Sequence, residues 1–290
     1  MWQRSRHTTP PTFQLQCNLS SYKKGSKKMA HHNEELQYHI QMKKGDVGRY
    51  VLLPGDPGRC EKIANYFDNP ELIVYNREYK TYTGTLLGEK VSVTSTGIGC
   101  PSTAIAVEEL IAIGADTFIR VGTSGGMQPN IKTGDVAIVN AAIRDEGTTS
   151  HYMPIEFPAI ADIDVVVALR EAAVKIGMPY HIGPTQSKDS FFGEIEPDRM
   201  PVDTRLNRRW KAWIAGGTVC SEMEAAALFI LSSIYRKRAG GVMLMASLDD
   251  VGGESIEERK AMFDVDRAIR VGIEGLKILI EKDKKQTERS

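Results

Sequence analysis

The chain has 290 residues, of which 41% are hydrophobic and 26% are charged, a composition ordinary for a soluble globular protein with a substantial core. Lysine and arginine together number 37, as do aspartate and glutamate, and this formal charge of zero argues against nucleic acid as the main partner. No apolar run approaches the roughly 20 residues that a membrane helix needs, so we expect no membrane association.

The first 28 residues differ from the rest because they are polar, basic and without hydrophobic periodicity. They lack the apolar run of a secretory signal. We expect residues 1–28 to be a disordered extension, or the product of a start codon read too far upstream, with Met29 opening the domain. An organelle transit peptide is the alternative. No linker-like segment divides residues 45–281, which predicts one domain over residues 29–290.

Strands, glycine-rich turns and helices alternate from about residue 45 onward. Apolar runs that end in turns predict strands within residues 49–59, 90–102, 117–126, 134–143 and 240–250. Helices are predicted over residues 60–67, 102–114, 162–177, 222–238 and 255–285, the third with Asp162 as its cap and Gly177 as its stop. This alternation predicts an α/β fold with three layers, in which helices flank a central, twisted, mixed or mainly parallel sheet.

Cysteine usage indicates a reducing compartment. The four cysteines lie far apart and form no CxxC pair, which favours reduced thiols in a cytoplasmic protein over disulfides or a zinc site; they are Cys17, Cys60, Cys100 and Cys220. The sequence contains no metal cluster and no organic cofactor motif.

Arg120 is unusual because it lies inside a run, Phe118 to Val121, with the composition of a buried strand. Burying an unpaired guanidinium is costly. One explanation is an edge strand with the arginine facing solvent. The other is that an anion binds where the strand ends, at the glycine-rich turn that begins at Gly122.

Three glycine-rich turns follow predicted strands: PGDPGR at residues 54–59, STGIGCPS at 95–102 and RVGTSGG at 120–126. Ligands of α/β sheets bind where strands end, and backbone N–H groups together with arginine side chains are suited to phosphate oxygens. None of the turns is a Walker loop or a dinucleotide fingerprint. Each alone is explained by a structural turn, but together they predict one convergent phosphate pocket.

Five motifs in order give the chain a resemblance to a known family: VLLPGDPGRCEKIA, STGIGCPSTAIAVEEL, FIRVGTSGGMQPNIKTGD, PIEFPAIAD and SEMEAAAL. They are similar, in order and spacing, to the hexameric nucleoside phosphorylases, and EFPAIAD looks closest to the uridine phosphorylase branch. The resemblance runs from about His39 to the last helix. It implies phosphate-dependent cleavage of a nucleoside, with inorganic phosphate as the cosubstrate and no organic cofactor.

The resemblance also implies roles for single residues. Those that would bind phosphate are Gly55, Arg59, Arg120 and Thr123, joined by Arg77 from a neighbouring subunit. Those that would hold the ribose are Glu222, Met223 and Glu224, joined by His39 across a dimer interface. Those that match a monovalent cation site between subunits, such as a K⁺ site, are Glu78, Ile98 and Ser102.

The predicted base pocket departs from the uridine phosphorylase pattern. Phe191 matches the stacking position and Arg199 the arginine that reads the base, but Glu194 stands where a glutamine is expected. An amide both donates and accepts, whereas an ionised carboxylate only accepts. Glu194 would therefore have to be protonated, to rotate away, or to read a different base.

Two alternatives to a uridine-cleaving enzyme stay open. Asp249 falls near the aspartate that protonates the leaving purine in other family members, which makes a purine nucleoside phosphorylase the second reading. A non-catalytic nucleoside-binding protein on the same scaffold is the third. A site shared between chains demands a homo-oligomer, at least a dimer, and the resemblance implies a hexamer.

Overall fold

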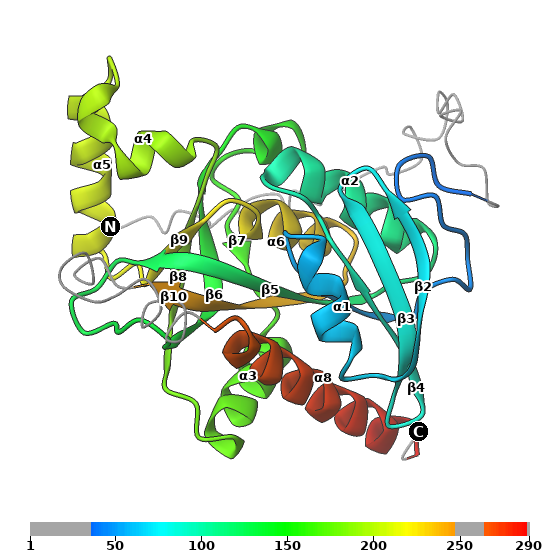
Figure 1. Cartoon of the computed structure of the whole chain (residues 1–290). Helices are drawn as coiled ribbons and strands as arrows, with labels where there is room; N and C mark the ends of the chain where they lie inside the picture. Colours follow the sequence, from blue (N-terminus) through cyan, green and yellow to red (C-terminus); the bar gives the residue numbers. More distant parts are fainter. Residues whose placement is uncertain (1–35, 247–263, 289–290) are drawn as a thin grey trace, which may run out of the picture. The chain divides into compact units, whose positions relative to one another are not determined.

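A ten-stranded mixed sheet is the centre of the fold in the computed structural model, which describes residues 36–246 and 264–288 (Figure 1). The strands are β1 (Tyr50–Leu53), β2 (Asp68–Asn76), β3 (Tyr79–Leu86), β4 (Glu89–Thr94), β5 (Thr117–Gly126), β6 (Val136–Asp145), β7 (Ala159–Ile160), β8 (Tyr180–Lys188), β9 (Cys220–Glu222) and β10 (Arg238–Ala246). Their order is β10-β6-β8-β9-β5-β1-β4-β3-β2, with β7 beside β6 and a further pairing between β10 and β5.

Helices cover both faces of this sheet, as the sequence predicts. They are α1 (Gly58–Ala64), α2 (Cys100–Ala112), α3 (Ile163–Lys175), α4 (Phe191–Ile195), α5 (Asp203–Ala215), α6 (Ala225–Ile234) and α8 (Asp266–Thr287), with short 3₁₀ helices η2 (Thr148–His151) and η3 (Pro197–Arg199). In Figure 1, α3 and α8 lie on one face and α2 and α6 on the other. No described helix is long and apolar enough to cross a lipid bilayer.

Two hydrophobic cores result from this layering. One contains the buried residues of α2 and α6, and the other those of α1, α3 and α8. Successive residues of β5 serve the two cores in turn, because side chains alternate between the faces of a strand: Phe118 packs in the first core and Ile119 in the second.

The centre of the sheet is parallel. β1 pairs in parallel with β4 on one side and β5 on the other, and β5 also pairs in parallel with β10. The carboxyl ends of these strands therefore meet at one edge of the sheet, and the loops that follow them are neighbours in space. This register brings together segments that are 41, 67 and 121 residues apart in sequence, as the pairs Tyr50–Val91, Tyr50–Thr117 and Thr117–Arg238 show.

Part of the sheet closes on itself. Pairings run from β5 through β10, β6, β8 and β9 and return to β5, where Gly125 and Gly126 pair with Ser221 and Cys220. Five strands thus form a barrel-like ring that the sequence patterns do not predict. The ring places the start of α6, which follows β9, beside the end of β5.

The element predictions hold best for the strands and helices with clear periodicity. Asp162 caps α3 as expected, since its side chain accepts from the backbone N–H groups of Asp164 and Val165. The helix predicted over residues 222–238 is shorter at both ends, because Glu222 belongs to β9 and the chain takes a positive φ of 56° at Arg236 before β10 begins. The structure adds the β2–β3 hairpin, β8 and α5. Residues 1–28 and the predicted helix start at residues 255–263 lie outside the described part.

Candidate active site

A cavity of about 950 Å³ opens at the carboxyl edge of the parallel strands. Its walls come from the loops after β1 and β4, from the second half of β5, from α4 and from the segment between β9 and α6. Twelve of the residues singled out from the sequence line it: Gly55, Arg59, Glu78, Ile98, Ser102, Arg120, Thr123, Phe191, Glu194, Glu222, Met223 and Glu224. The three glycine-rich segments therefore converge, because β4, β1 and β5 are adjacent parallel strands. The turn predicted from Gly122 onward is wrong, however, because β5 continues as a strand to Gly126.

Arg120 is deeply buried, with 6% of its side chain exposed, on a strand flanked by β1 and β10. This central position excludes the edge-strand explanation. Gly122, two residues on, makes room for the guanidinium, because a Cβ there would lie only 3.1 Å from Arg120 Nη2. The glycine therefore leaves the same side of β5 open for the arginine side chain.

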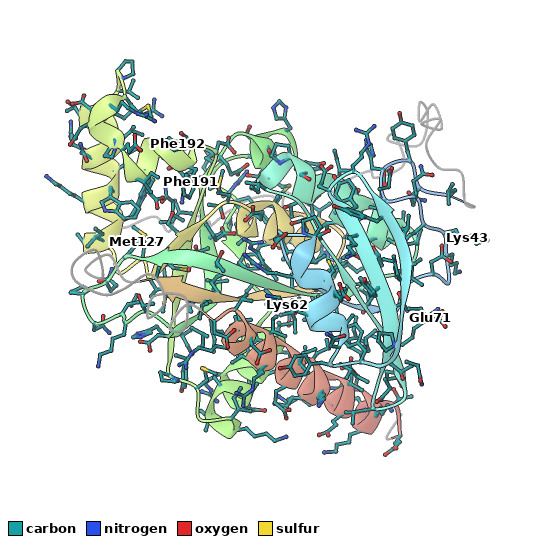
Figure 2. All side chains as sticks on the ribbon, viewed as in Figure 1. Lys43, Lys62, Glu71, Met127, Phe191 and Phe192 are labelled. Atoms are coloured by element: carbon teal, nitrogen blue, oxygen red, sulfur yellow. The ribbon has the colours of Figure 1, made fainter. Side chains whose placement is uncertain are left out.

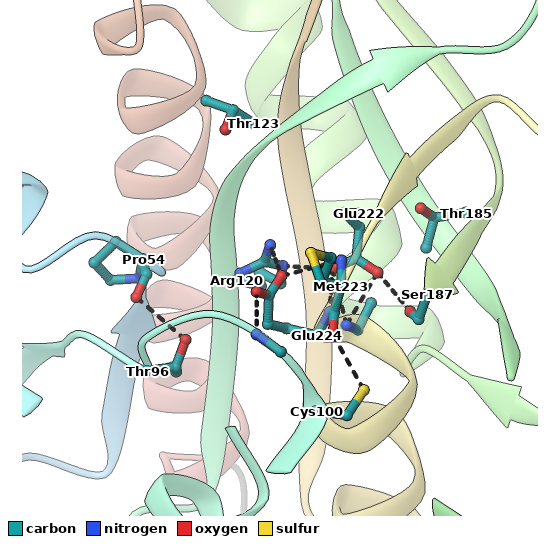
Figure 3. A network of polar contacts seen from close by, with 12 residues as sticks. Pro54, Thr96, Cys100, Arg120, Thr123, Thr185, Ser187, Glu222, Met223 and Glu224 are labelled. Carbon is teal, nitrogen blue, oxygen red and sulfur yellow. Dashed lines mark hydrogen bonds and ion pairs between the residues drawn. The ribbon is translucent and has the colours of Figure 1, made fainter. Parts of the chain in front are cut away.

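The partners of Arg120 are carboxylates of the same chain. Its Nε donates to Glu222 Oε2 at 2.9 Å, and its Nη2 donates to Glu224 (Figure 3). Burial alone acts to lower the pKa of Arg120, but the charges of Glu224 and Glu222 outweigh it and raise the pKa. Two carboxylates of the same chain thus compensate the charge of Arg120, a partner set that the sequence alone does not predict, and its contact with an anion stays a prediction. Nη1 is buried and has no partner among the described residues, so it remains available to an anion.

Glu222 fixes this arrangement through several hydrogen bonds. Besides Arg120, its carboxylate accepts from Ser187 Oγ at 2.5 Å and from the backbone N–H groups of Glu224 and Ala225 (Figure 3). With 1% of its side chain exposed and both oxygens occupied, Glu222 holds Arg120 and accepts hydrogen bonds from the N–H groups at the start of α6. This is a more structural role than the ribose contact that the resemblance implies.

Glu224 follows at the N-cap of α6. Its Oε1 accepts from the backbone N–H of Gly99 at 2.7 Å, and its other oxygen receives Arg120. Burial raises the pKa of Glu224, the positive charge of Arg120 opposes this, and the neighbouring Glu222 adds to the rise. The turn before α2, where Gly99 has a φ of 93°, is thus connected directly to the start of α6.

Arg59 lacks such compensation. Its Nη2 donates to Thr123 Oγ1 at 3.3 Å, and no carboxylate within the described residues forms an ion pair with it. Burial lowers the pKa of Arg59, and the positive charge of Arg120 lowers it further. The guanidinium groups of Arg59 and Arg120 line the same cavity and create a positive electrostatic potential there. A bound anion would reduce the repulsion between them.

The opposite wall of the cavity is aromatic and charged. Phe191 begins α4, where Ser190 Oγ accepts from the backbone N–H of Gly193 at 3.0 Å and caps the short helix. Figure 2 shows Phe191 and Phe192 together on α4, and their rings meet edge to face with centroids 5.5 Å apart. Phe191 is half-exposed and presents an aromatic surface to the cavity.

Glu194 also lies on this wall, and its charge has a partner. Its Oε2 is 2.7 Å from Lys188 Nζ, and the two side chains are only 13% and 8% exposed. Ser221 donates a hydrogen bond to the same oxygen. The ion pair allows an ionised carboxylate in the cavity, so Glu194 need be neither protonated nor turned away.

Most of the chain is similar to known proteins. Residues 49–279 match the family model described as the phosphorylase superfamily. The chain belongs to this phosphorylase superfamily. It is 51% identical to a uridine phosphorylase of Treponema pallidum over 87% of this chain and 97% of the relative, and 47% identical to a uridine phosphorylase of Thermococcus kodakarensis over 87% and 90%. A guanosine phosphorylase of Halorubrum lacusprofundi is 36% identical over 84% of this chain and 99% of the relative.

Not every residue expected from the phosphorylase pattern reaches the cavity. Arg199 pairs instead with Glu196 at 2.8 Å, stacks over the Phe192 ring and is 62% exposed. Arg199 therefore does not line the cavity of this chain, because η3 carries it to the surface, and its role in reading the base stays a prediction. Asp249 lies outside the described residues.

His39 and Arg77 lie apart from the cavity of their own chain. His39 Nδ1 lies 2.7 Å from Glu109 Oε1, near the C-terminal end of α2. Arg77 is exposed at the turn between β2 and β3, with a positive φ of 54°. Neither lines the cavity, so any contribution from them to a phosphorylase site has to be made to another chain.

Glu78, Ile98 and Ser102 form one edge of the cavity. Ser102 Oγ donates to Glu78 Oε1 at 2.8 Å, and Ile98 is 77% exposed. Burial acts to raise the pKa of Glu78, but hydrogen bonds from its own backbone N–H and from Ser102 outweigh it and lower the pKa. The oxygens are hard donors of the kind alkali cations prefer. No group of three or more histidine, cysteine or acidic residues suited to a metal ion occurs among the described residues.

Sequence reasoning missed three polar residues at this phosphorylase site. Ser187 and Lys188 end β8, and Ser221 lies in β9. A lysine or a serine at the end of an unrecognised strand carries no motif. The run Tyr180–Lys188 also gives no clear strand signal, because none of its residues after Ile182 is hydrophobic and it contains Pro184.

Proposed function

We propose that the protein is a uridine phosphorylase, which reversibly cleaves the N-glycosidic bond of uridine with inorganic phosphate to give uracil and ribose 1-phosphate. The observation that carries the proposal is that the partly buried Arg59 and the deeply buried Arg120 line one cavity together with Glu224. The relatives named uridine phosphorylase support the same reading.

The anion end of the cavity suits phosphate. Arg59, the free Nη1 of Arg120 and the Thr123 hydroxyl would orient phosphate and remove its water, which is the main obstacle for such a charged nucleophile. As a phosphate oxygen bonds to C1′, the bond from C1′ to the base nitrogen breaks and the base leaves as an anion. The ribose gains positive charge at this point, and the carboxylate of Glu224 would stabilise it while accepting from the ribose hydroxyls.

The complete site is proposed to need a second chain. His39 and Arg77 would complete the ribose and phosphate ends of a neighbouring cavity, which requires at least a dimer, and a hexamer built from such dimers is proposed. Glu78, Ile98 and Ser102 would hold a monovalent cation such as K⁺ where two chains meet. We place the enzyme in the cytoplasm, in keeping with the free thiols of Cys60, Cys100 and Cys220.

A purine substrate is the second candidate. It is favoured by the carboxylate of Glu194 in the position where the uridine pattern expects an amide, and by the relative named guanosine phosphorylase. Inosine and guanosine share with uridine a ring carbonyl beside an N–H group, so both substrate classes present a similar edge.

A product assay tests the proposal. The purified protein is incubated with uridine, inosine, guanosine or adenosine, each with and without phosphate, and free base is measured by chromatography. Uracil released only when phosphate is present is the expected result. Release of purine bases alone would favour the second candidate, and binding of uridine without any turnover would favour a non-catalytic nucleoside-binding protein.

A further inference from the structure

We propose that Lys188 and Glu194 act as one donor–acceptor couple that reads a base edge in which a carbonyl stands beside an N–H group. The inference rests on the proposed function and extends it, because it assigns Lys188 to the site and defines the class of base accepted. Uracil, hypoxanthine and guanine have this edge, whereas cytosine and adenine carry an amino group beside an unprotonated ring nitrogen.

Both side chains are held in place by protein contacts and line the same cavity as Phe191. Lys188 Nζ lies 2.7 Å from Glu194 Oε2 and donates to Ser221 Oγ at 2.6 Å. Ser221 Oγ in turn lies 2.8 Å from Gln186 Oε1, a buried amide whose Nε2 donates to Asp145. The couple is therefore anchored to β8 and β9 through a chain of buried polar groups.

Each member of the couple keeps one unused group. The Lys188 ammonium has three protons, and the contacts with Glu194 and Ser221 occupy two of them. Glu194 Oε1 receives no hydrogen bond from the described residues and faces Gly125, where a Cβ would lie 3.9 Å away. Gly125 lines the cavity, so one donor and one acceptor are left beside each other on its wall.

This arrangement explains how a glutamate can stand at position 194, where the uridine phosphorylase pattern has a glutamine. In uracil the ring N3–H would donate to Glu194 Oε1, and the adjacent carbonyl would accept from Lys188. A single amide would supply both groups by itself, and here two charged side chains divide the two tasks. Cytosine would place an unprotonated nitrogen against the carboxylate and an amino group against the ammonium, so both contacts would be repulsive.

The test compares variants of the couple with a variant of a neighbouring ion pair. Lys188→Met and Glu194→Ala remove the couple, while Glu196→Ala removes a neighbouring exposed carboxylate that does not line the cavity. The double variant Lys188→Met/Glu194→Gln removes both charges and supplies an amide. Thermal unfolding of each variant shows whether it is folded. The kcat/KM for phosphorolysis is measured with uridine, cytidine and 3-methyluridine, which lacks the N3–H group.

We expect the wild-type enzyme to prefer uridine over cytidine and over 3-methyluridine by about 10⁴-fold, as sites built to pair a buried polar edge do. Lys188→Met should lower kcat/KM for uridine by about 10- to 100-fold, the usual loss for a hydrogen bond to a charged group. The double variant should recover most of that loss, whereas the Glu196→Ala control should resemble the wild type.

Two results would overturn the inference. One is a wild-type enzyme that cleaves 3-methyluridine or cytidine as well as uridine. The other is a folded Lys188→Met variant whose uridine preference equals that of the Glu196→Ala control. Titration calorimetry with uracil, cytosine and 3-methyluracil separates this from a failure of the proposed function: selective uracil binding that Lys188→Met abolishes, without phosphate-dependent cleavage, would reject the activity and retain the couple.

Discussion

At the scale of single residues, the two arginines of the cavity differ in what compensates their charges. Arg120 is held by Glu222 and Glu224, so its charge is part of the folded structure. The Arg59 side chain hydrogen-bonds only the Thr123 hydroxyl among the described residues, and its pKa is lowered by burial and by Arg120. A group whose charged form is disfavoured in the folded state reduces stability, and such sites commonly exchange stability for function.

Arg59→Ala should therefore weaken phosphate binding without weakening the phosphate-free protein. We expect the KM for phosphate to rise by at least about tenfold, the loss of one charge-assisted contact, while the unfolding temperature without phosphate is unchanged or higher. Phosphate should raise the unfolding temperature of the wild type but not of the variant. Differential scanning calorimetry with and without phosphate measures both.

Lys62→Ala provides the matched control, because Lys62 is an exposed cation on the same helix, α1 (Figure 2). Its phosphate KM should equal that of the wild type. A clear loss of stability in phosphate-free Arg59→Ala, with no change in phosphate KM, would show that Arg59 is a structural residue.

At the scale of elements, the start of α6 is built by residues outside the helix. Its N-cap residue, Glu224, makes no capping hydrogen bond, and the free N–H groups of the first turn are satisfied by Glu222 and by Ser187 from β8. The start of α6 is therefore connected to the sheet at the position where Glu224 faces the cavity. At α3, by contrast, Asp162 caps its own helix far from the cavity.

Ser187→Ala should affect stability and catalysis together. Losing the hydroxyl leaves the Ala226 N–H without its partner at 2.9 Å and removes a hydrogen bond to Glu222, for a cost of about 1–3 kcal/mol. Because Glu222 and Glu224 would shift, we expect kcat/KM for the nucleoside to fall as well. Urea unfolding and steady-state kinetics measure the two effects.

Asp162→Ala is the comparison variant for this prediction. Loss of an ordinary helix cap should cost about 1 kcal/mol and leave kcat/KM unchanged. If Ser187→Ala has the same small effect on stability and none on kcat/KM, the start of α6 does not depend on Ser187 as proposed.

At the scale of the whole molecule, one chain holds an incomplete set of the expected phosphorylase residues. Arg77 lies on an exposed turn and outside the cavity that contains Arg59 and Arg120. If Arg77 acts in the cavity of a neighbouring chain, replacing it in one chain impairs the cavity of that neighbour and leaves the chain's own cavity unaffected.

Mixing two inactive variants tests this directly. Arg59→Ala and Arg77→Ala chains, unfolded together and refolded as a 1:1 mixture, should regain about a quarter of the wild-type activity, because half the dimers are mixed and one of their two sites is intact. Each variant refolded alone serves as the control. A mixture no more active than the average of its components would mean that Arg77 does not act between chains.

Much of the site was predictable from local chain features. The glycine-rich loops after β1 and β4, Arg120 inside a β-branched run, and Asp162 before α3 each carry a local signal that the structure reproduces. The turn predicted from Gly122 onward is not reproduced, because those residues continue β5. Lys188 and Ser187 carry no such signal, because no alternation of hydrophobic residues marks β8. The position of Arg199 depends on η3, which turns it outward toward Glu196.

The sequence by itself determined which segments form the layers and which loops are rich in backbone donors and arginines, because those properties depend on residues a few positions apart. Only the tertiary structure decided which charges compensate one another. Arg120 meets Glu222 and Glu224 across more than 100 residues because β5 and β9 close a ring of strands. Lys188 meets Glu194 because α4 folds back over the end of β8, and no periodicity or spacing encodes such a contact.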